Sequence, residues 1–297
     1  TRAQRDQIWP VFSAYRSELD RLGKVEWQDL IHEAGQLLAT GQVPAPYRAI
    51  VVDESQDLTA EELRLLRRMV TAGPNDLFFV GDAHQRIYGY PIVMQHCGIH
   101  IRGRSARLRI NYRTTEEIRK WATAVLSGLP FDDLDGEEDT LEHYHSLLRG
   151  FAPVVRHFST SEEESAFLIQ EIRTLCETVA PETICLVART HEQLRSQYLP
   201  LLRSAGINHL FLDKDTPDYV GSGIRLATMH RVKGLEFAHV LLVGANADYL
   251  PLKGIDTADG DLLQAERCLI HVAATRARET LTVTSWGTPS PLLCPPA

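Results

Sequence analysis

The sequence predicts an α/β protein built from parallel sheets and divided into two units. Short apolar runs rich in β-branched residues alternate with segments of helical periodicity in two separate stretches of the chain. In the first stretch, the runs at 49–52 and 77–80 are each followed by acidic residues, which is typical of buried parallel strands with functional residues at their carboxyl ends. The 297 residues, 44% of them hydrophobic, are enough for two ordinary domains.

Each element follows from a local pattern. Apolar residues at helical spacing predict helices up to residue 38, and the segment GQVPAP then ends them. A strand at 49–52, a helix at about 60–70 capped by Thr59 and a strand at 77–82 then predict a βαβ unit. The second stretch predicts strands at 155–158, 183–188, 224–229, 239–244 and 281–286. It predicts helices at about 162–176 and, after the strand at 183–188, up to 202.

A change in composition near residue 107 predicts the boundary between the units. We therefore expect a first unit at 1–107, a second at 108–286 and a Pro-rich, disordered tail at 287–297. The acidic run at 132–142 has no strong apolar period, so we expect a solvated loop there.

Composition narrows the class of protein. A formal charge of -8 argues against a surface covered in nucleic-acid-binding charge, so any DNA contact must come from a local groove. Five widely spaced cysteines without a CxxC pair favour a reducing cytoplasm over a disulfide framework or a zinc ribbon. No apolar run is long enough to span a membrane, and the start lacks the apolar core of a signal peptide. The chain begins without Met, so we expect a fragment or a processed chain.

Two motifs carry candidate chemistry. In DESQD at 53–57, one carboxylate at a strand end can hold Mg²⁺ and a second can orient a water, although a helix start is also often acidic. In VGDAHQRIYGY at 80–90, Gln85 can sense a γ-phosphate, and Tyr88 and Tyr90 can stack on bases. The alternative for the second motif is a turn with tyrosines in the core. His96, Cys97 and His100 lack a fourth metal ligand, so surface and core roles are favoured for them.

In this order, DExQD and GDxxQxIY resemble the UvrD/Rep-type superfamily 1 DNA helicases. Three further segments agree with that family: NYR at 111–113, TxHxxKGLEF at 228–237 and VAxTRA at 272–277. The resemblance implies two RecA-like parallel-sheet lobes, the first of them truncated, with ATP between them. It also implies ATP hydrolysis coupled to 3′-to-5′ movement on single-stranded DNA.

The resemblance also implies roles for individual residues. Asp53 resembles the Mg²⁺ ligand and Glu54 the general base beside it, while Gln85 is expected to link the γ-phosphate to the DNA site. Arg113 and Arg276 resemble arginine fingers that neutralise charge on the phosphates, rather than surface salt-bridge partners. The remaining nucleotide contacts are expected from Gly234 and from Glu236, which would bind the ribose. The candidates for the single-stranded DNA track are Tyr88, Tyr90, Thr228 and His230.

The sequence departs from the family in several places. GxxxxGK[ST] does not occur, so we expect this chain alone to be a poor ATPase. Two alternatives remain: an upstream part of the first lobe supplies the phosphate-binding loop, or the protein lacks that loop. YGYPIV replaces the usual end of the aromatic motif, His271 stands where Tyr is common, and 113–228 is too short for a large accessory domain. Two alternatives stay open, an ATP-independent module that binds single-stranded DNA or protein and an ATPase switch that moves no DNA. The presence of Glu54, Gln85, Arg113 and Arg276 argues against both.

Overall fold

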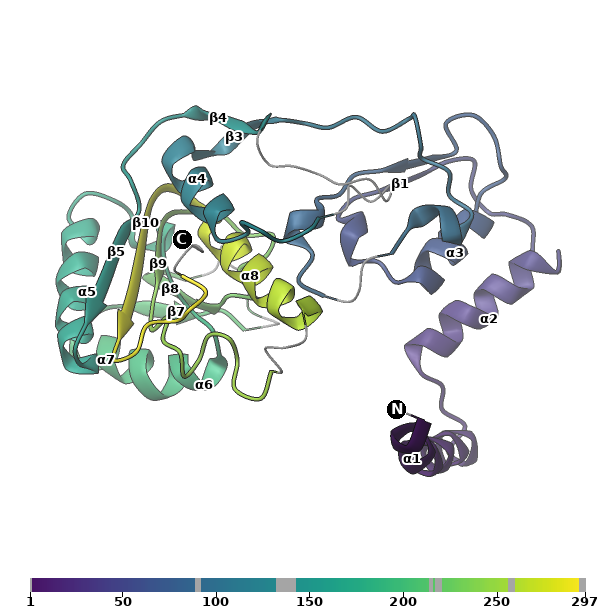
Figure 1. Ribbon diagram of the computed structural model, residues 1–297, viewed down its shortest axis with the longest axis horizontal. Coiled ribbons are helices and arrows are strands. Elements are labelled where there is room, and N and C mark those ends of the chain that lie inside the picture. Colours follow the sequence, from purple (N-terminus) through teal and green to yellow (C-terminus); the bar gives the residue numbers. More distant parts are fainter. Residues whose placement is uncertain are drawn as a thin grey trace. The chain divides into compact units, whose positions relative to one another are not determined.

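The computed structural model describes residues 2–88, 92–131, 143–213, 216, 221–255 and 260–293. The chain forms two compact units (Figure 1), one of Thr1–Gly81 with Pro91–Arg104 and one of Asp82–Tyr90 with Ser105–Ala297. Residues 82–90 therefore belong to the second unit, whereas the sequence placed them in the first. The predicted α/β class with parallel sheets is confirmed. The predicted acidic loop at 132–142 lies outside the described residues.

The first unit contains the predicted βαβ arrangement. Strand β1 (Ile50–Val52) pairs in parallel with β2 (Leu77–Phe79), and α3 (Ala60–Arg68) connects them. Helix α3 begins at Thr59 because the Thr59 hydroxyl accepts the Glu62 backbone N–H, as predicted. Helices α1 (Arg2–Arg21) and α2 (Trp27–Ala39) precede it, and short 3₁₀ turns lie at Ser55–Asp57 and Met94–Cys97.

The prediction that the first-unit strands are buried is wrong on one face. Val51 is 74% exposed and Phe78 is 62% exposed, whereas their neighbours in both strands are half-buried. Successive side chains of a strand point to opposite faces, and the two facing outward here, which are register partners, share the uncovered face.

The second unit is built on a six-stranded parallel sheet in the order β5-β10-β9-β6-β8-β7. These strands are β5 (Val154–Phe158), β6 (Ile184–Ala188), β7 (His209–Phe211), β8 (Ile224–Thr228), β9 (Phe237–Leu242) and β10 (Ala277–Trp286). A separate parallel pair joins β3 (Ile110–Thr115) to β4 (His145–Leu148). The helices are α4 (Glu116–Ala124), α5 (Ser161–Cys176), α6 (His191–Gln193), α7 (Leu199–Ser204) and α8 (Gly260–Ala274), with a π turn at Leu194–Tyr198 and 3₁₀ turns at Ala83–Gln85 and Pro181–Thr183.

Two apolar layers cover the faces of this sheet. In β6, alternate residues divide between them: Ile184 and Leu186 pack with Leu168 of α5, while Cys185 and Val187 belong to the layer that includes residues of α4 and α8. Figure 1 shows α5, α6 and α7 apart from α4 and α8. All five β6 side chains are buried, as expected for a central parallel strand.

A buried polar cluster ties α5 to the sheet. Glu164 is 1% exposed and accepts hydrogen bonds from the Tyr198 hydroxyl, the Gly244 N–H and the Thr284 hydroxyl at 2.9, 3.0 and 2.6 Å. These three donors satisfy a carboxylate that would otherwise be costly to bury.

The chain after residue 286 differs from the prediction. Residues 287–293 were expected to be disordered, but Ser290 is fully buried and its N–H donates to the Ala245 carbonyl. Leu292 is 5% exposed and joins the apolar core, which is why this segment is ordered. Residues 294–297 lie outside the described residues.

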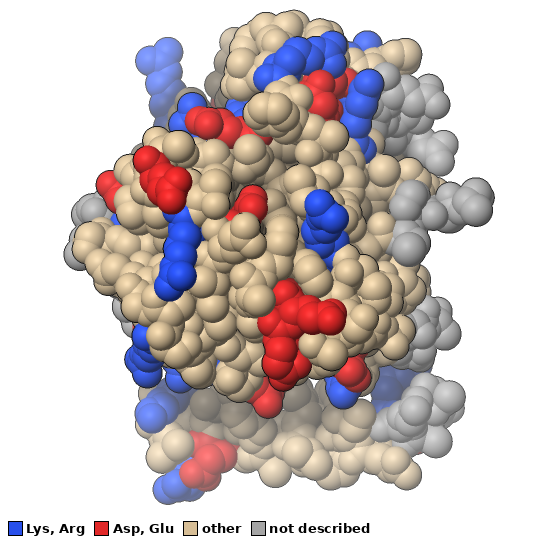
Figure 2. Space-filling model, turned by 90° about the vertical axis from the view of Figure 1, so that its left-hand side faces the viewer, with Lys and Arg blue, Asp and Glu red and all other residues tan. Residues whose placement is uncertain are grey.

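The surface gives two further observations. Figure 2 shows Lys and Arg side chains scattered over the face that it presents, with acidic groups between them and no continuous basic patch. Among the described helices, none combines the length and the apolar character that crossing a membrane requires.

Candidate functional site

The two candidate acids lie in the first unit, directly after β1. The Glu54 N–H donates to Asp53 Oδ1 at 2.8 Å, and the Gln56 side-chain amide donates to the Glu54 carboxylate. Glu54 has φ +52° and ψ +37°, a left-handed conformation that is uncommon for a residue with a long side chain. Such strain is typical of functional positions. Both carboxylates are exposed, so both are available to a ligand.

Gln85 is held by its own segment in the second unit. Its side-chain nitrogen donates to Asp82 Oδ2 at 2.8 Å, which leaves the amide oxygen pointing away from that carboxylate. Asp82 also accepts the His84 N–H at 3.0 Å. The buried His84 ring lies 4.5 Å from the ring of Phe131, and this contact anchors the segment in the unit. Asp82 and His84, to which the sequence analysis assigned no role, therefore fix the orientation of Gln85.

Arg276 meets the amide oxygen of Gln85. Its Nη2 atom donates to Gln85 Oε1 at 3.1 Å, and its Nε atom donates to the Val272 carbonyl in the last turn of α8 at 3.1 Å. The residue is 3% exposed, so the geometry does not support an exposed surface salt bridge. Lys233 adds a second link, because its Nζ atom donates to the Gln85 backbone carbonyl at 3.1 Å.

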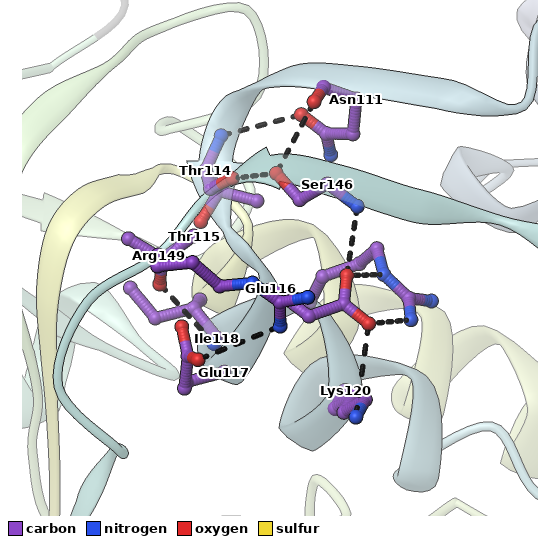
Figure 3. A network of polar contacts seen from close by, with 10 residues as sticks. Asn111, Thr114, Thr115, Glu116, Glu117, Ile118, Lys120, Ser146 and Arg149 are labelled. Carbon is purple, nitrogen blue, oxygen red and sulfur yellow. Dashed lines mark hydrogen bonds and ion pairs between the residues drawn. The ribbon is translucent and has the colours of Figure 1, made fainter.

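Arg113 is presented by a tight turn in β3. Asn111 Oδ1 accepts the backbone N–H groups of Arg113 and Thr114 at 2.7 and 3.2 Å, the pattern of an Asx turn. The Ser146 hydroxyl donates to the carbonyls of Asn111 and Thr114 and fastens this turn to β4 (Figure 3).

The base of that turn is also fixed. The Ser146 N–H donates to Glu116 Oε2 at 2.7 Å (Figure 3). Arg119 donates two hydrogen bonds to the Glu116 carboxylate and lowers the pKa of Glu116 to about 2, with burial opposing and the Ser146 N–H assisting. The hydrogen bonds of Glu116 with Arg119 and with the Ser146 N–H thus hold the NYR segment rigidly in place.

Arg113 and Glu236 form an ion pair. Arg113 Nε lies 2.6 Å from Glu236 Oε1, and the two side chains are 46% and 39% exposed. Gly234 has φ +81°, and a Cβ there would meet no atom, so glycine is needed for the backbone conformation. The turn at Gly234 separates Lys233, which contacts the Gln85 segment, from Glu236, which contacts Arg113.

The candidate DNA residues divide into two groups. Tyr88 is 50% exposed, its ring lies 5.8 Å from that of His230, and Lys233 Nζ lies 5.8 Å from the Tyr88 ring centre. Thr228 is buried, and its hydroxyl accepts the Arg231 N–H at 3.2 Å, which gives it a structural role in the turn after β8. Tyr90 lies outside the described residues.

A buried ion pair adjoins His230. Arg189, at the end of β6, donates two hydrogen bonds to Glu266 of α8, and their side chains are 9% and 5% exposed. Burial lowers the pKa of His230, as does the Arg189 charge, while Glu266 opposes them. This pair carries no local sequence signal, because its partners are 77 positions apart.

The second unit therefore brings together Gln85 and Arg276, Arg113 and Glu236, and Tyr88 and His230. Asp53 and Glu54 lie in the other unit. Among the described residues, no group of three or more His, Cys, Asp or Glu side chains is arranged to hold a metal ion. Cys97 is buried, and burial raises the pKa of its thiol.

Comparisons with known proteins agree with these motifs. Residues 1–92 match the UvrD/REP helicase N-terminal domain, and residues 201–287 match the UvrD-like helicase C-terminal domain. The chain is 26% identical over 92% of its length to the Mycoplasma pneumoniae protein described as "Probable DNA helicase", covering 51% of that protein. It is 24% identical over 91% of its length to DNA helicase IV of Escherichia coli, covering 38% of it.

A third relative is a mitochondrial ATP-dependent DNA helicase of Saccharomyces cerevisiae, 29% identical over 59% of this chain and 26% of the relative. The chain thus spans about half the length of the first of these relatives and less of the others. Among solved structures, the C-terminal domain of a possible DNA helicase from Lactobacillus plantarum is similar at 18% identity and a TM-score of 0.47, covering 62% of this chain and 93% of that one.

Proposed function

Because the chain belongs to the UvrD/Rep-type helicases, we propose that it is part of an ATP-dependent DNA helicase that moves on single-stranded DNA in the 3′-to-5′ direction. The observation that carries the proposal is the contact between Arg276 and Gln85 at 3.1 Å. A γ-phosphate sensor and an arginine finger are expected to respond to the same phosphate group, and here they already touch.

Each unit contributes a different part of the chemistry. In the first unit, Asp53 would hold Mg²⁺, and the Glu54 carboxylate would accept a proton from the attacking water. The exposed carboxylates and the strained Glu54 backbone support these roles. Bound Mg²⁺ supplies charge neutralisation at the phosphates.

In the second unit, Arg276 and Arg113 neutralise the charge that develops during phosphoryl transfer. Arg276 is held in place by the Val272 carbonyl and by Gln85, so little reorganisation is needed before reaction. Arg113 is half-exposed and paired with Glu236, so phosphate oxygens compete with that carboxylate for its guanidinium. When Arg113 leaves it, Glu236 becomes available as an acceptor for the ribose hydroxyls.

The proposed DNA track begins at Tyr88 and His230. An exposed aromatic ring beside a lysine suits a nucleobase and its phosphate, because stacking and charge act together. The same segment carries Gln85, and this gives nucleotide state a short route to the DNA contacts.

The test uses the full-length protein. ATP hydrolysis is measured with and without a single-stranded oligonucleotide, and unwinding is measured on duplexes with a 3′ or a 5′ tail. We expect DNA-stimulated turnover and unwinding from the 3′ tail. Arg276→Ala should lower kcat by about a thousandfold or more, as loss of an arginine finger does.

Arg278→Ala is the matched control, because it removes the same charge from an exposed residue two positions away. Its kcat should stay within about twofold of the wild type. Binding of single-stranded DNA without any turnover would favour the binding-module alternative. ATP hydrolysis that DNA does not stimulate, together with no unwinding, would favour the alternative of an ATPase switch that moves no DNA.

A further inference from the structure

The backbone at Arg276 and Ala277 is held from two sides by residues that directly follow proposed nucleotide contacts. The Phe237 N–H donates to the Arg276 carbonyl at 3.0 Å, and Phe237 follows Glu236. The Thr114 hydroxyl donates to the Ala277 carbonyl at 2.6 Å, and Thr114 follows Arg113. Three motifs that are far apart in the sequence thus meet on one peptide segment.

We propose that Thr114 is a positioning residue that fixes the two arginines, Arg113 and Arg276, relative to each other. Its hydrogen bond is a side-chain link between the NYR turn and the segment that carries Arg276. Thr114 is fully buried, so water does not replace its hydroxyl as a donor to Ala277.

The geometry around Thr114 favours positioning over simple filling of space. Its N–H is held by the Asn111 side chain and its carbonyl accepts from the Ser146 hydroxyl, so its backbone is already fixed by β3 and β4 (Figure 3). The hydroxyl is then free to orient a different element, the start of β10. A change at this hydroxyl therefore moves Arg276 relative to Arg113 without unfolding the turn.

The partner side chains complete the arrangement. Arg113 pairs with Glu236, and Arg276 contacts Gln85. Because Phe237 pairs with Ala277 in the β9–β10 register, Glu236 directly precedes the register partner of the residue that Thr114 binds. The link thus sets the spacing of two cations that would bind one phosphate group, a distance on which transition-state stabilisation depends steeply.

The inference rests on the proposed ATPase function and is tested in the full-length protein. Thr114→Val removes the hydroxyl while keeping the shape of the side chain, and Thr114→Ser keeps the hydroxyl. We expect Thr114→Val to lower kcat for ATP about tenfold with KM within about twofold, and Thr114→Ser to stay within about threefold of the wild type. Combining Thr114→Val with Arg276→Ala should lower kcat no further than Arg276→Ala alone, because the two act as a unit.

Thr115→Val is the matched control. Thr115 is the next residue and is also buried, but its hydroxyl accepts the Ile118 N–H at the start of α4 and does not reach β10. A purely structural role for Thr114 predicts equal kcat for Thr114→Val and Thr115→Val at matched thermal stability. That result would overturn the positioning role of Thr114 and leave the proposed function standing. If the wild-type protein does not hydrolyse ATP, or if a variant lacking both arginines hydrolyses it as fast as the wild type, the proposed function is wrong. The positioning role of Thr114 is then wrong as well.

Discussion

Glu266→Gln leaves the Arg189 guanidinium buried without its counter-ion. The native pair is bidentate, with Arg189 Nε 3.0 Å from Glu266 Oε2, and both side chains are less than a tenth exposed. Removing one partner of such a buried pair costs about 3–5 kcal/mol of unfolding free energy. Gln keeps the size and one acceptor oxygen, so we expect a loss at the lower end of that range, about 3 kcal/mol.

The assay must report on the second unit. Of the four tryptophans, Trp9 and Trp27 lie in the first unit, so replacing both with Phe leaves Trp121 and Trp286 as fluorescent reporters of the second. With a slope of about 2 kcal/mol per molar urea, a loss of 3 kcal/mol lowers the unfolding midpoint by roughly 1.5 M.

Two comparisons decide the interpretation. The double variant Arg189→Met with Glu266→Leu should recover most of the midpoint, since apolar replacement of a buried pair is often neutral or stabilising. Asp248→Asn breaks an exposed pair with Lys253, where the side chains are 67% and 75% exposed, and should shift the midpoint by less than about 0.3 M. A Glu266→Gln shift no larger than that of Asp248→Asn would refute the reasoning.

Two further predictions concern pH and Gln85. Burial lowers the pKa of His271 from 6.5 to about 4. Below pH 6.5 the unfolded chain therefore binds a proton at this histidine that the folded unit does not bind. The free energy of unfolding should fall by up to about 3 kcal/mol from pH 6.5 to pH 4. His271→Gln should remove that part of the pH dependence, and an unchanged profile in urea titrations at several pH values would contradict it. Asp82→Asn frees the Gln85 amide to turn its nitrogen towards Arg276, so kcat for ATP in the full-length protein should fall about tenfold with DNA affinity within about twofold. Wild-type kcat in that variant would exclude this positioning role for Asp82.

Much of the fold follows from local sequence. The strand β6 and the helix α5 were predicted at 183–188 and at about 162–176. In the structure all five β6 side chains are buried, and Thr160 accepts the Glu163 N–H at the start of α5. The helices at 116–124 and 260–274 and the strands at 110–115, 145–148 and 209–211 were not predicted. Helix α8 is apolar on most sides because core surrounds it, which weakens its helical period.

The candidate site was only partly accessible from sequence. Motifs identified Gln85, Arg113 and Arg276 because their neighbours in the chain form recognisable patterns. Motifs did not reveal that Asp82 orients Gln85, nor that Thr114 reaches Ala277 across 163 positions, because tertiary hydrogen bonds carry no local spacing. The exposed face at Val51 and Phe78 was also invisible, since a strand's pattern does not tell which face is covered.

The path of the chain between the two units has a thermodynamic consequence. The chain passes from one unit to the other at 81–82, at 90–91 and at 104–105. Three covalent tethers keep the units at a higher effective concentration than a single flexible linker does. The loss of translational and rotational entropy that any association of the two units would carry is smaller for that reason.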